Sequence, residues 1–149
     1  QGLVKKEIYE KAESYALMLF SEGQKWAKER GLILVDTKYE FGIYKDELIV
    51  IDEIHTPDSS RYWVESEYEK RFNNKESQLM LDKENIRQWL IEKDFSGEGT
   101  PPELTDEIRT LLSEKYIELY EKLTGKKFIP SLGNVKDRIN LNLSNVDFI

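Results

Sequence analysis

The spacing of apolar residues changes at Gly31, and this change most constrains the fold. Across residues 5–30, apolar side chains recur every three or four positions, which is typical of one face of an amphipathic helix. Beyond Gly31, a glycine placed where such a helix would end, the apolar runs are short and then alternate with polar residues. The chain is therefore predicted to pass from a long helix into β-structure.

Two strands are predicted after this helix. The first includes the apolar run 32–35 and an alternating stretch that reaches Phe41, and the second is the apolar run 48–51. Turn-forming residues separate the two runs, so we expect an antiparallel hairpin. Residues 55–61 contain Pro-Asp and paired serines and are predicted to form a loop.

Two further helices are predicted in the second half of the chain. One covers about 83–92 after a capping Asp82, and the other runs from a capping Thr105 to Gly125. Residues 126–149 lose clear periodicity, and within them 140–148 fit an edge strand, a docked extension or a disordered end. The predicted fold class is α/β (α+β), with an antiparallel hairpin or sheet packed by long helices.

Length and composition exclude several classes of protein. The chain has 149 residues, enough for one domain with its own core, and a net charge of −7, which disfavours nucleic-acid binding. It has no cysteine, which excludes disulfides, zinc–thiolate sites and thiol nucleophiles. No apolar run approaches the roughly 18–20 residues that cross a bilayer, and no signal peptide opens the sequence. We expect a cytoplasmic protein without nucleic-acid or membrane partners.

Charged residues alternate along the first predicted strand. Asp36, Lys38 and Glu40 are spaced two apart, so their side chains are expected on one face. Two carboxylates and an ammonium in one row can hold Mg²⁺ and the phosphates that it bridges. An ordinary half-exposed strand shows the same alternation, so the pattern alone leaves both interpretations open.

The turn of the hairpin decides whether Glu40 can share a metal ion with Asp52, which ends the second strand. A two-residue turn would place Glu40 opposite Ile51 and turn Asp52 away. An odd-length turn or a bulge would place Glu40 opposite Asp52. A shared metal site is predicted to require this odd connection.

The loop after the hairpin carries a second group of reactive side chains. Asp58, Ser59, Ser60 and Arg61 supply a carboxylate, two hydroxyls and a guanidinium in consecutive positions. The fork of an arginine suits a phosphate or a carboxylate, whereas a plain turn with an exposed arginine is the simpler alternative. His55 is the single histidine, which makes it a poor candidate for a metal cluster or a catalytic triad.

Several of these segments together resemble the signatures of SAICAR synthetase (phosphoribosylaminoimidazole-succinocarboxamide synthase). The two longest are Gly31-Leu-Ile-Leu-Val-Asp-Thr-Lys-Tyr-Glu-Phe-Gly42 and Asp52-Glu-Ile-His-Thr-Pro-Asp-Ser-Ser-Arg-Tyr-Trp63, and residues 82–90 and 113–125 also resemble that family. The resemblance implies that residues 1–128 form the C-terminal domain of such a ligase and that 129–149 are an extension of unknown role. The family's N-terminal nucleotide-binding half is expected to be missing from this sequence, and the chain alone is expected to have little or no activity.

The resemblance also implies a reaction of purine biosynthesis. The family uses ATP to join carboxyaminoimidazole ribonucleotide to L-aspartate, through an acyl phosphate that the aspartate amine displaces. Phosphoryl transfer depends mainly on positioning and on neutralisation of oxygen charge, which Mg²⁺ and cationic side chains provide. The expected cofactors are ATP and Mg²⁺, and the expected partners are these small molecules and the missing N-terminal half, with a homo-oligomer left open.

A role for each candidate residue follows from the same resemblance. Glu40 and Asp52 are expected to bind Mg²⁺–ATP, and Lys38 to contact a nucleotide phosphate or the activated carboxylate. Asp36 is expected to orient Lys38 or to take a proton from the amine. The expected ligands of the imidazole ribonucleotide are Asp58, Ser59, Ser60, Arg61, Lys83 and Arg87.

Two other functions remain as alternatives. An acidic α/β interaction module derived from the same fold would need no catalytic pocket. A kinase-like phosphotransferase would also place an acidic residue after a strand, but the sequence has no His-Arg-Asp catalytic loop.

Overall fold

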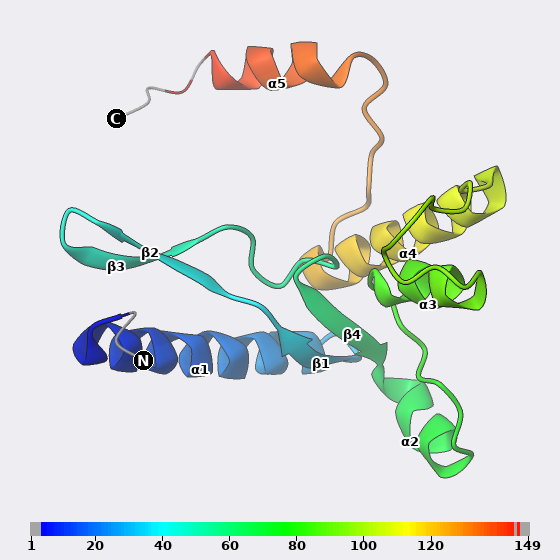
Figure 1. Cartoon of the computed structure of the whole chain (residues 1–149), viewed down its shortest axis with the longest axis horizontal. Helices are drawn as coiled ribbons and strands as arrows, with labels where there is room; N and C mark the ends of the chain where they lie inside the picture. The colour runs from blue at the N-terminus through cyan, green and yellow to red at the C-terminus, as the bar shows by residue number, and fades with distance from the viewer. Residues whose placement is uncertain (1–3, 145, 147–149) are drawn as a thin grey trace.

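Long helices and short antiparallel strands make up the molecule, as the computed structural model shows for residues 4–144 and 146 (Figure 1). This arrangement confirms the predicted α+β class. None of the helices in these residues combines the length and apolar character needed to cross a bilayer. In chain order the elements are α1 (Lys6–Lys28), β1 (Leu32–Thr37), β2 (Glu40–Tyr44), β3 (Glu47–Ile51), β4 (Ser60–Val64), α2 (Glu65–Asn73), α3 (Glu84–Glu92), α4 (Asp106–Thr124) and α5 (Val135–Leu143).

Two separate two-stranded sheets carry the β-structure. The predicted hairpin is present as β2 and β3, and its two-residue turn has φ values of 49° at Lys45 and 64° at Asp46, which suit the twist of a hairpin. β1 instead pairs with β4, part of which was predicted to be loop. The prediction of one strand over 32–41 is therefore wrong, because the chain leaves one sheet at Thr37 and enters the other at Glu40.

A change of register shapes the sheet of β1 and β4. Leu34 pairs with Tyr62 and Asp36 with Arg61, so the register shifts between these two pairs, as at a β-bulge. The free edge of β4 is met by residues 79–81, through hydrogen bonds from Val64 N to Leu79 O (3.0 Å) and from Leu81 N to Tyr62 O (3.1 Å). β4 is thus the central strand of this part of the molecule.

The hydrophobic core lies where α1, this sheet and α4 meet. Its fully buried members are Ala27, Leu32, Leu34, Tyr62, Leu81 and Leu119. The end of α4 is attached to α1 by Trp26 Nε1 and Arg30 Nε, which donate to Leu123 O at 2.9 and 3.1 Å. That carbonyl is one of the last four of a helix, which have no partner within the helix. Side chains of α1 and of the turn after it therefore satisfy the end of α4.

The C-terminal half agrees with the predicted helices but not with a terminal strand. α3 and α4 form as expected, and Gly125 ends α4 with a φ of 68°. The edge strand considered for 140–148 is wrong over its first residues, because 140–143 belong to α5. Asn134 starts that helix by accepting hydrogen bonds from two following backbone N–H groups. Positions 145 and 147–149 of that interpretation lie outside the described residues.

His55 fixes the loop that follows β3. Its Nε2 and the Tyr39 hydroxyl form a 2.6 Å hydrogen bond, and its backbone oxygen accepts from the Tyr62 hydroxyl at 2.9 Å. Partial burial lowers the pKa of His55, which favours the neutral ring. Gly23 of α1 makes room for this ring, since a Cβ there would lie 2.5 Å from His55 Cε1 and 2.8 Å from Leu34 Cδ2.

We expect Gly23→Ala to lower the free energy of unfolding by about 1 kcal/mol or more, measured by thermal and urea denaturation. Alanine gains about 1 kcal/mol of helix propensity, and overpacking typically costs about 1–3 kcal/mol. The cost lies at the upper end of that range here, because His55 cannot move away without losing Tyr39. The control is Ser21→Ala at an exposed position of the same helix, which should not destabilise the chain. A Gly23→Ala variant as stable as the parent would contradict the close packing.

Candidate functional site

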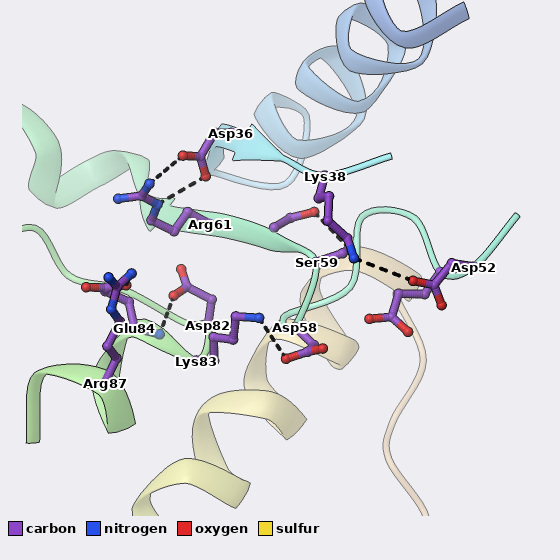
Figure 2. A pocket seen from close by; sticks show the side chains of 12 residues that line it. Asp36, Lys38, Asp52, Asp58, Ser59, Arg61, Asp82, Lys83, Glu84 and Arg87 are labelled. Carbon is purple, nitrogen blue, oxygen red and sulfur yellow. Dashed lines mark hydrogen bonds and ion pairs between the residues drawn. The ribbon is translucent and has the colours of Figure 1, made fainter. Parts of the chain in front are cut away.

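A cavity of about 280 Å³ lies where the end of β1, the loop before β4 and the start of α3 meet (Figure 2). Most of the site residues predicted from the sequence line it, although they come from separate elements. These are Asp36, Lys38, Asp52, Asp58, Ser59, Ser60, Arg61, Lys83 and Arg87. Glu40 is not part of the lining but forms an ion pair with Lys38. The structure therefore brings the predicted residues together, and their individual roles stay predictions.

Lys38 lies between two carboxylates at one side of this pocket. Its Nζ donates to Glu40 and is 3.9 Å from Asp52 Oδ2. The hydrogen bond and charge of Glu40 raise the pKa of Lys38 above its ordinary value, so the ammonium form is favoured. The Lys38 backbone N–H donates to Ser59 O at 3.0 Å, which holds this residue beside the loop before β4.

The hairpin register does not place Glu40 opposite Asp52. With the two-residue turn, Glu40 pairs with Ile51, so the odd connection predicted to be needed for a shared metal site is not formed. Asp52 still approaches Lys38, because its φ of 65° takes the chain out of the extended strand. Glu40 and Asp52 are thus brought together through Lys38. Among the residues that the structure describes, no group of three or more His, Cys, Asp or Glu side chains is arranged to hold a metal ion.

Asp36 and Arg61 form an ion pair across the β1–β4 sheet. Arg61 Nε donates to Asp36 Oδ1 at 3.1 Å and Nη2 donates to Oδ2, so both carboxylate oxygens are used. Asp36 raises the pKa of Arg61 further above its ordinary value through this hydrogen bond and its charge. Asp36 therefore orients Arg61, whereas the sequence interpretation paired it with Lys38.

The start of α3 supplies two more cations to the pocket. Lys83 Nζ donates to Asp58 Oδ1 at 3.0 Å, and the Lys83 backbone N–H donates to Pro57 O at 3.1 Å. This lysine lowers the pKa of Asp58 below its ordinary value through the hydrogen bond and its charge. Arg87 follows one helical turn later, with Nη1 3.6 Å from Glu84 Oε2. Figure 2 shows Arg61 and Arg87 on one side of the pocket and Lys38 and Asp52 on the other.

The two serines hold the shape of the loop between these sides. Ser60 is 5% exposed, and its hydroxyl lies 2.8 Å from the Thr37 hydroxyl. The Ser59 hydroxyl accepts from the Thr56 backbone N–H at 3.2 Å. Both hydroxyls are therefore engaged within the protein, where they shape the loop, and their contact with a substrate stays a prediction.

Asp82 is the main site residue that sequence reasoning missed. It is fully buried, and its carboxylate accepts hydrogen bonds from Tyr62 N at 2.7 Å and Glu84 N at 2.8 Å. Burial raises the pKa of Asp82, while the two N–H groups act in the opposite direction. The helix-capping interpretation covered only the bond to Glu84, because β4 was not predicted. Glu53 and Glu84 also line the pocket and were missed, and no signal in the sequence separates them from other surface acids.

Comparison with known proteins gives one consistent family. The sequence model of the family described as SAICAR synthetase matches residues 1–103. The phosphoribosylaminoimidazole-succinocarboxamide synthase of Bacteroides thetaiotaomicron is 48% identical over 148 residues, covering 97% of this chain and 47% of its own length. That of Azobacteroides pseudotrichonymphae is 50% identical over 144 residues, covering 95% and 45%. The chain thus spans about half the length of the curated relatives that it matches.

Solved structures agree with this result. A SAICAR synthase from Saccharomyces cerevisiae, complexed with SAICAR, matches with a TM-score of 0.70 and 38% identity over 85% of this chain and 41% of its own. A SAICAR synthetase in complex with ADP matches with a TM-score of 0.59 and 28% identity over 85% of this chain and 42% of its own. The fold and the sequence therefore point to the same group of proteins.

Asp82→Ala should lower the free energy of unfolding by about 2–4 kcal/mol, since it leaves unpaired the buried Tyr62 N–H, at about 1–3 kcal/mol, and the part-buried Glu84 N–H, at about 1 kcal/mol. Urea denaturation followed by tryptophan fluorescence measures this change. Glu92→Ala, at the exposed end of α3, is the matched control and should change stability little. A loss for Asp82→Ala no larger than for this control would show that the buried carboxylate does not hold the two elements together.

The pKa of Asp58 tests the ion pair with Lys83. We expect a pKa below the ordinary value in the parent chain and a rise toward that value in Lys83→Met, because the ammonium that stabilises the carboxylate is removed. Titration of the carboxyl carbon by NMR reports both values. Lys70→Met, on α2, should leave the Asp58 pKa unchanged, and an unperturbed pKa in the parent would refute the pairing.

Proposed function

Since this chain belongs to the SAICAR synthetase family, we propose that it forms the C-terminal part of an ATP-dependent ligase of purine biosynthesis. The proposed reaction joins carboxyaminoimidazole ribonucleotide to L-aspartate and produces SAICAR. Residues 1–128 are its proposed C-terminal domain and 129–149 an extension. The family's N-terminal half is proposed to complete the active site, and a cytoplasmic location is part of the proposal.

The observation that carries this proposal is the two-sided pocket. One side has Lys38 between the carboxylates of Glu40 and Asp52, and the other has the cations Arg61 and Arg87, while Lys83 reaches between them to Asp58 (Figure 2). Carboxylates with a lysine suit magnesium and nucleotide phosphates. A cationic side suits the phosphate and carboxylate of an imidazole ribonucleotide. The match to a structure complexed with SAICAR and to one with ADP supports both assignments.

The charge of the pocket supports a requirement for magnesium. The lining contains four cationic side chains and six carboxylates, so the pocket itself is negative. A polyphosphate would be repelled from such a surface without a bound cation. The hairpin register does not pair Glu40 with Asp52 directly, and Lys38 lies between them. Their oxygen donors fit the preference of Mg²⁺ for hard ligands, and we propose that they hold it when Lys38 turns to a phosphate oxygen. When bound, the ion neutralises phosphate oxygens during phosphoryl transfer.

The cationic side chains then have separate proposed tasks. Lys38 stays protonated and is placed to stabilise the charge on the transferred phosphoryl group. Arg61 and Lys83 bind the anionic groups of the ribonucleotide in exchange for their present carboxylate partners, Asp36 and Asp58. Arg87 lies one turn along α3 and adds a further donor on this side.

The release of Asp36 from Arg61 supplies a base for the second half of the reaction. The amine of aspartate attacks the activated carboxyl carbon, a C–N bond forms, and phosphate leaves with the electrons of the C–O bond. The proton lost by the amine passes to the Asp36 carboxylate. Asp36 is suited to this task because it sits beside Arg61, at the side proposed to hold the ribonucleotide.

Isothermal titration of the chain with ADP tests the proposed nucleotide side. We expect binding that requires Mg²⁺ and that weakens at least tenfold in Glu40→Gln and in Asp52→Asn, because each change removes one oxygen charge from the ion. Glu47→Gln, in the same hairpin but outside the pocket, is the matched control and should bind as the parent does. Magnesium-dependent binding that survives both pocket substitutions would place the nucleotide elsewhere.

A ligation assay tests the whole proposal. The chain mixed with the N-terminal half of the B. thetaiotaomicron relative should form SAICAR from carboxyaminoimidazole ribonucleotide, aspartate and ATP, and neither half should do so alone. Asp36→Asn in the mixture should lower kcat at least tenfold, because the proposed base is lost. A mixture that associates but has no ligase activity would favour the non-catalytic interaction module.

A further inference from the structure

His55 occupies the middle of a loop that has pocket residues at both of its ends. It lies three positions after Asp52 and three before Asp58, and both of these carboxylates line the pocket (Figure 2). His55 is not part of that lining, and its ring lies against α1 instead, where a Cβ on Gly23 would be 2.5 Å from His55 Cε1. The middle of the loop is therefore held against the helix, while its two ends reach the pocket.

Backbone pairing alone does not hold this loop. The β2–β3 ladder ends with the pair of Glu40 and Ile51, so Asp52 is the first residue beyond it. In the part of the chain that the structure describes, residues 53–55 form no hydrogen bond with another backbone group. Asp52 and His55 also have positive φ values of 65° and 58°, which persist only where the surroundings impose them. Side-chain contacts therefore determine the path of the chain here.

Two tyrosines provide these contacts, and both act on His55. The Tyr39 hydroxyl and His55 Nε2 form a 2.6 Å hydrogen bond, and the two rings meet edge to face with 5.6 Å between their centroids. The Tyr62 hydroxyl donates to the His55 backbone oxygen at 2.9 Å. Tyr62 is 1% exposed, so the loss of this partner would leave a buried hydroxyl unpaired. The ring and the backbone of His55 are thus fixed by separate residues.

Tyr39 stands between two residues of the proposed nucleotide side. Lys38 and Glu40 flank it in the sequence and form an ion pair with each other. The Tyr39–His55 hydrogen bond therefore joins the segment that carries Lys38 and Glu40 to the loop that begins at Asp52. Lys38 Nζ lies 3.9 Å from Asp52 Oδ2, although the hairpin register leaves Asp52 unpaired. A contact outside the pocket thus connects the two segments whose side chains meet inside it.

We propose that His55 is a positioning residue of the nucleotide site. Through its hydrogen bond with Tyr39, it holds the Asp52 carboxylate at the distance from Lys38 and Glu40 that a bound magnesium–nucleotide requires. His55 contributes a fixed position and no proton transfer, so another side chain that reaches Tyr39 from the same place can replace it. The inference rests on the proposed function for its ligand, whereas the arrangement of the loop can be tested without one.

A purely structural role for His55 leads to different expectations. A histidine that only fills the space beside Gly23 would change stability when replaced, but the folded molecules would keep Asp52 beside Lys38. A positioning histidine changes the pocket of molecules that are still folded. Tyr39→Phe separates the two roles, because it removes one hydroxyl and keeps the aromatic ring that packs against His55.

NMR of the full chain without ligand tests the position of the loop. Backbone chemical shifts and scalar couplings of Asp52 report its φ, which is positive in the parent. We expect Tyr39→Phe and His55→Ala to shift the Asp52 signals and to populate negative φ. His55→Gln, whose amide can still hydrogen bond to Tyr39, should restore the parent signals, and Tyr9→Phe, exposed on α1, is the matched control. Asp52 signals that keep the parent positions in Tyr39→Phe overturn the proposal.

Isothermal titration with ADP and Mg²⁺ tests the consequence for binding, at a temperature where urea denaturation shows every variant to be folded. We expect the affinity to fall about fivefold in Tyr39→Phe, the effect of losing one hydrogen bond, and to stay within about twofold of the parent in His55→Gln and Tyr9→Phe. An unchanged affinity in Tyr39→Phe contradicts the proposal. A parent that binds no ADP with Mg²⁺ counts against the proposed nucleotide site, and the Asp52 signals then decide the role of His55 by themselves.

Discussion

The buried carboxylate of Asp82 is the contact on which the geometry of the pocket depends. It accepts N–H groups from Tyr62 and Glu84, and so joins β4 to the start of α3. β4 carries Arg61 and the start of α3 carries Lys83, so one buried side chain sets the spacing of two cations that face the same cavity. Because unpaired buried N–H groups are costly, this spacing is part of the folded state and does not wait for a ligand.

The charges of the pocket are arranged as exchangeable pairs. Arg61 is paired with Asp36, Lys83 with Asp58, and Lys38 with Glu40 and Asp52. These side chains are all substantially exposed, and such pairs contribute only about 0–1 kcal/mol each. They therefore orient the cations at little cost, and an anionic substrate can replace the carboxylates without a large loss of stability. The same exchange frees carboxylates for binding a cation or accepting a proton, which is what the proposed ligation requires.

Local patterns in the sequence predicted the elements that local forces determine. The long first helix, the β2–β3 hairpin and the end of α4 at Gly125 follow from spacing and turn residues, and all three are present. The pairing of β1 with β4 was not predictable, because it depends on a partner distant in sequence whose first residues look like turn chemistry. The family resemblance identified most of the site residues. Asp82 was predicted only as a helix cap, because its second partner, Tyr62, lies on β4, which was not predicted.

The backbone conformation of the loop after β3 links the hydrophobic core to the pocket. Asp52 and His55 both have positive φ, at 65° and 58°, in a region that residues other than glycine rarely occupy. Such conformations persist only when surrounding contacts determine them. His55 is held by Tyr39 and by the space that Gly23 leaves on α1. The core therefore anchors this loop. The positive φ at Asp52 brings its carboxylate near Lys38, whereas the hairpin register alone would turn it away.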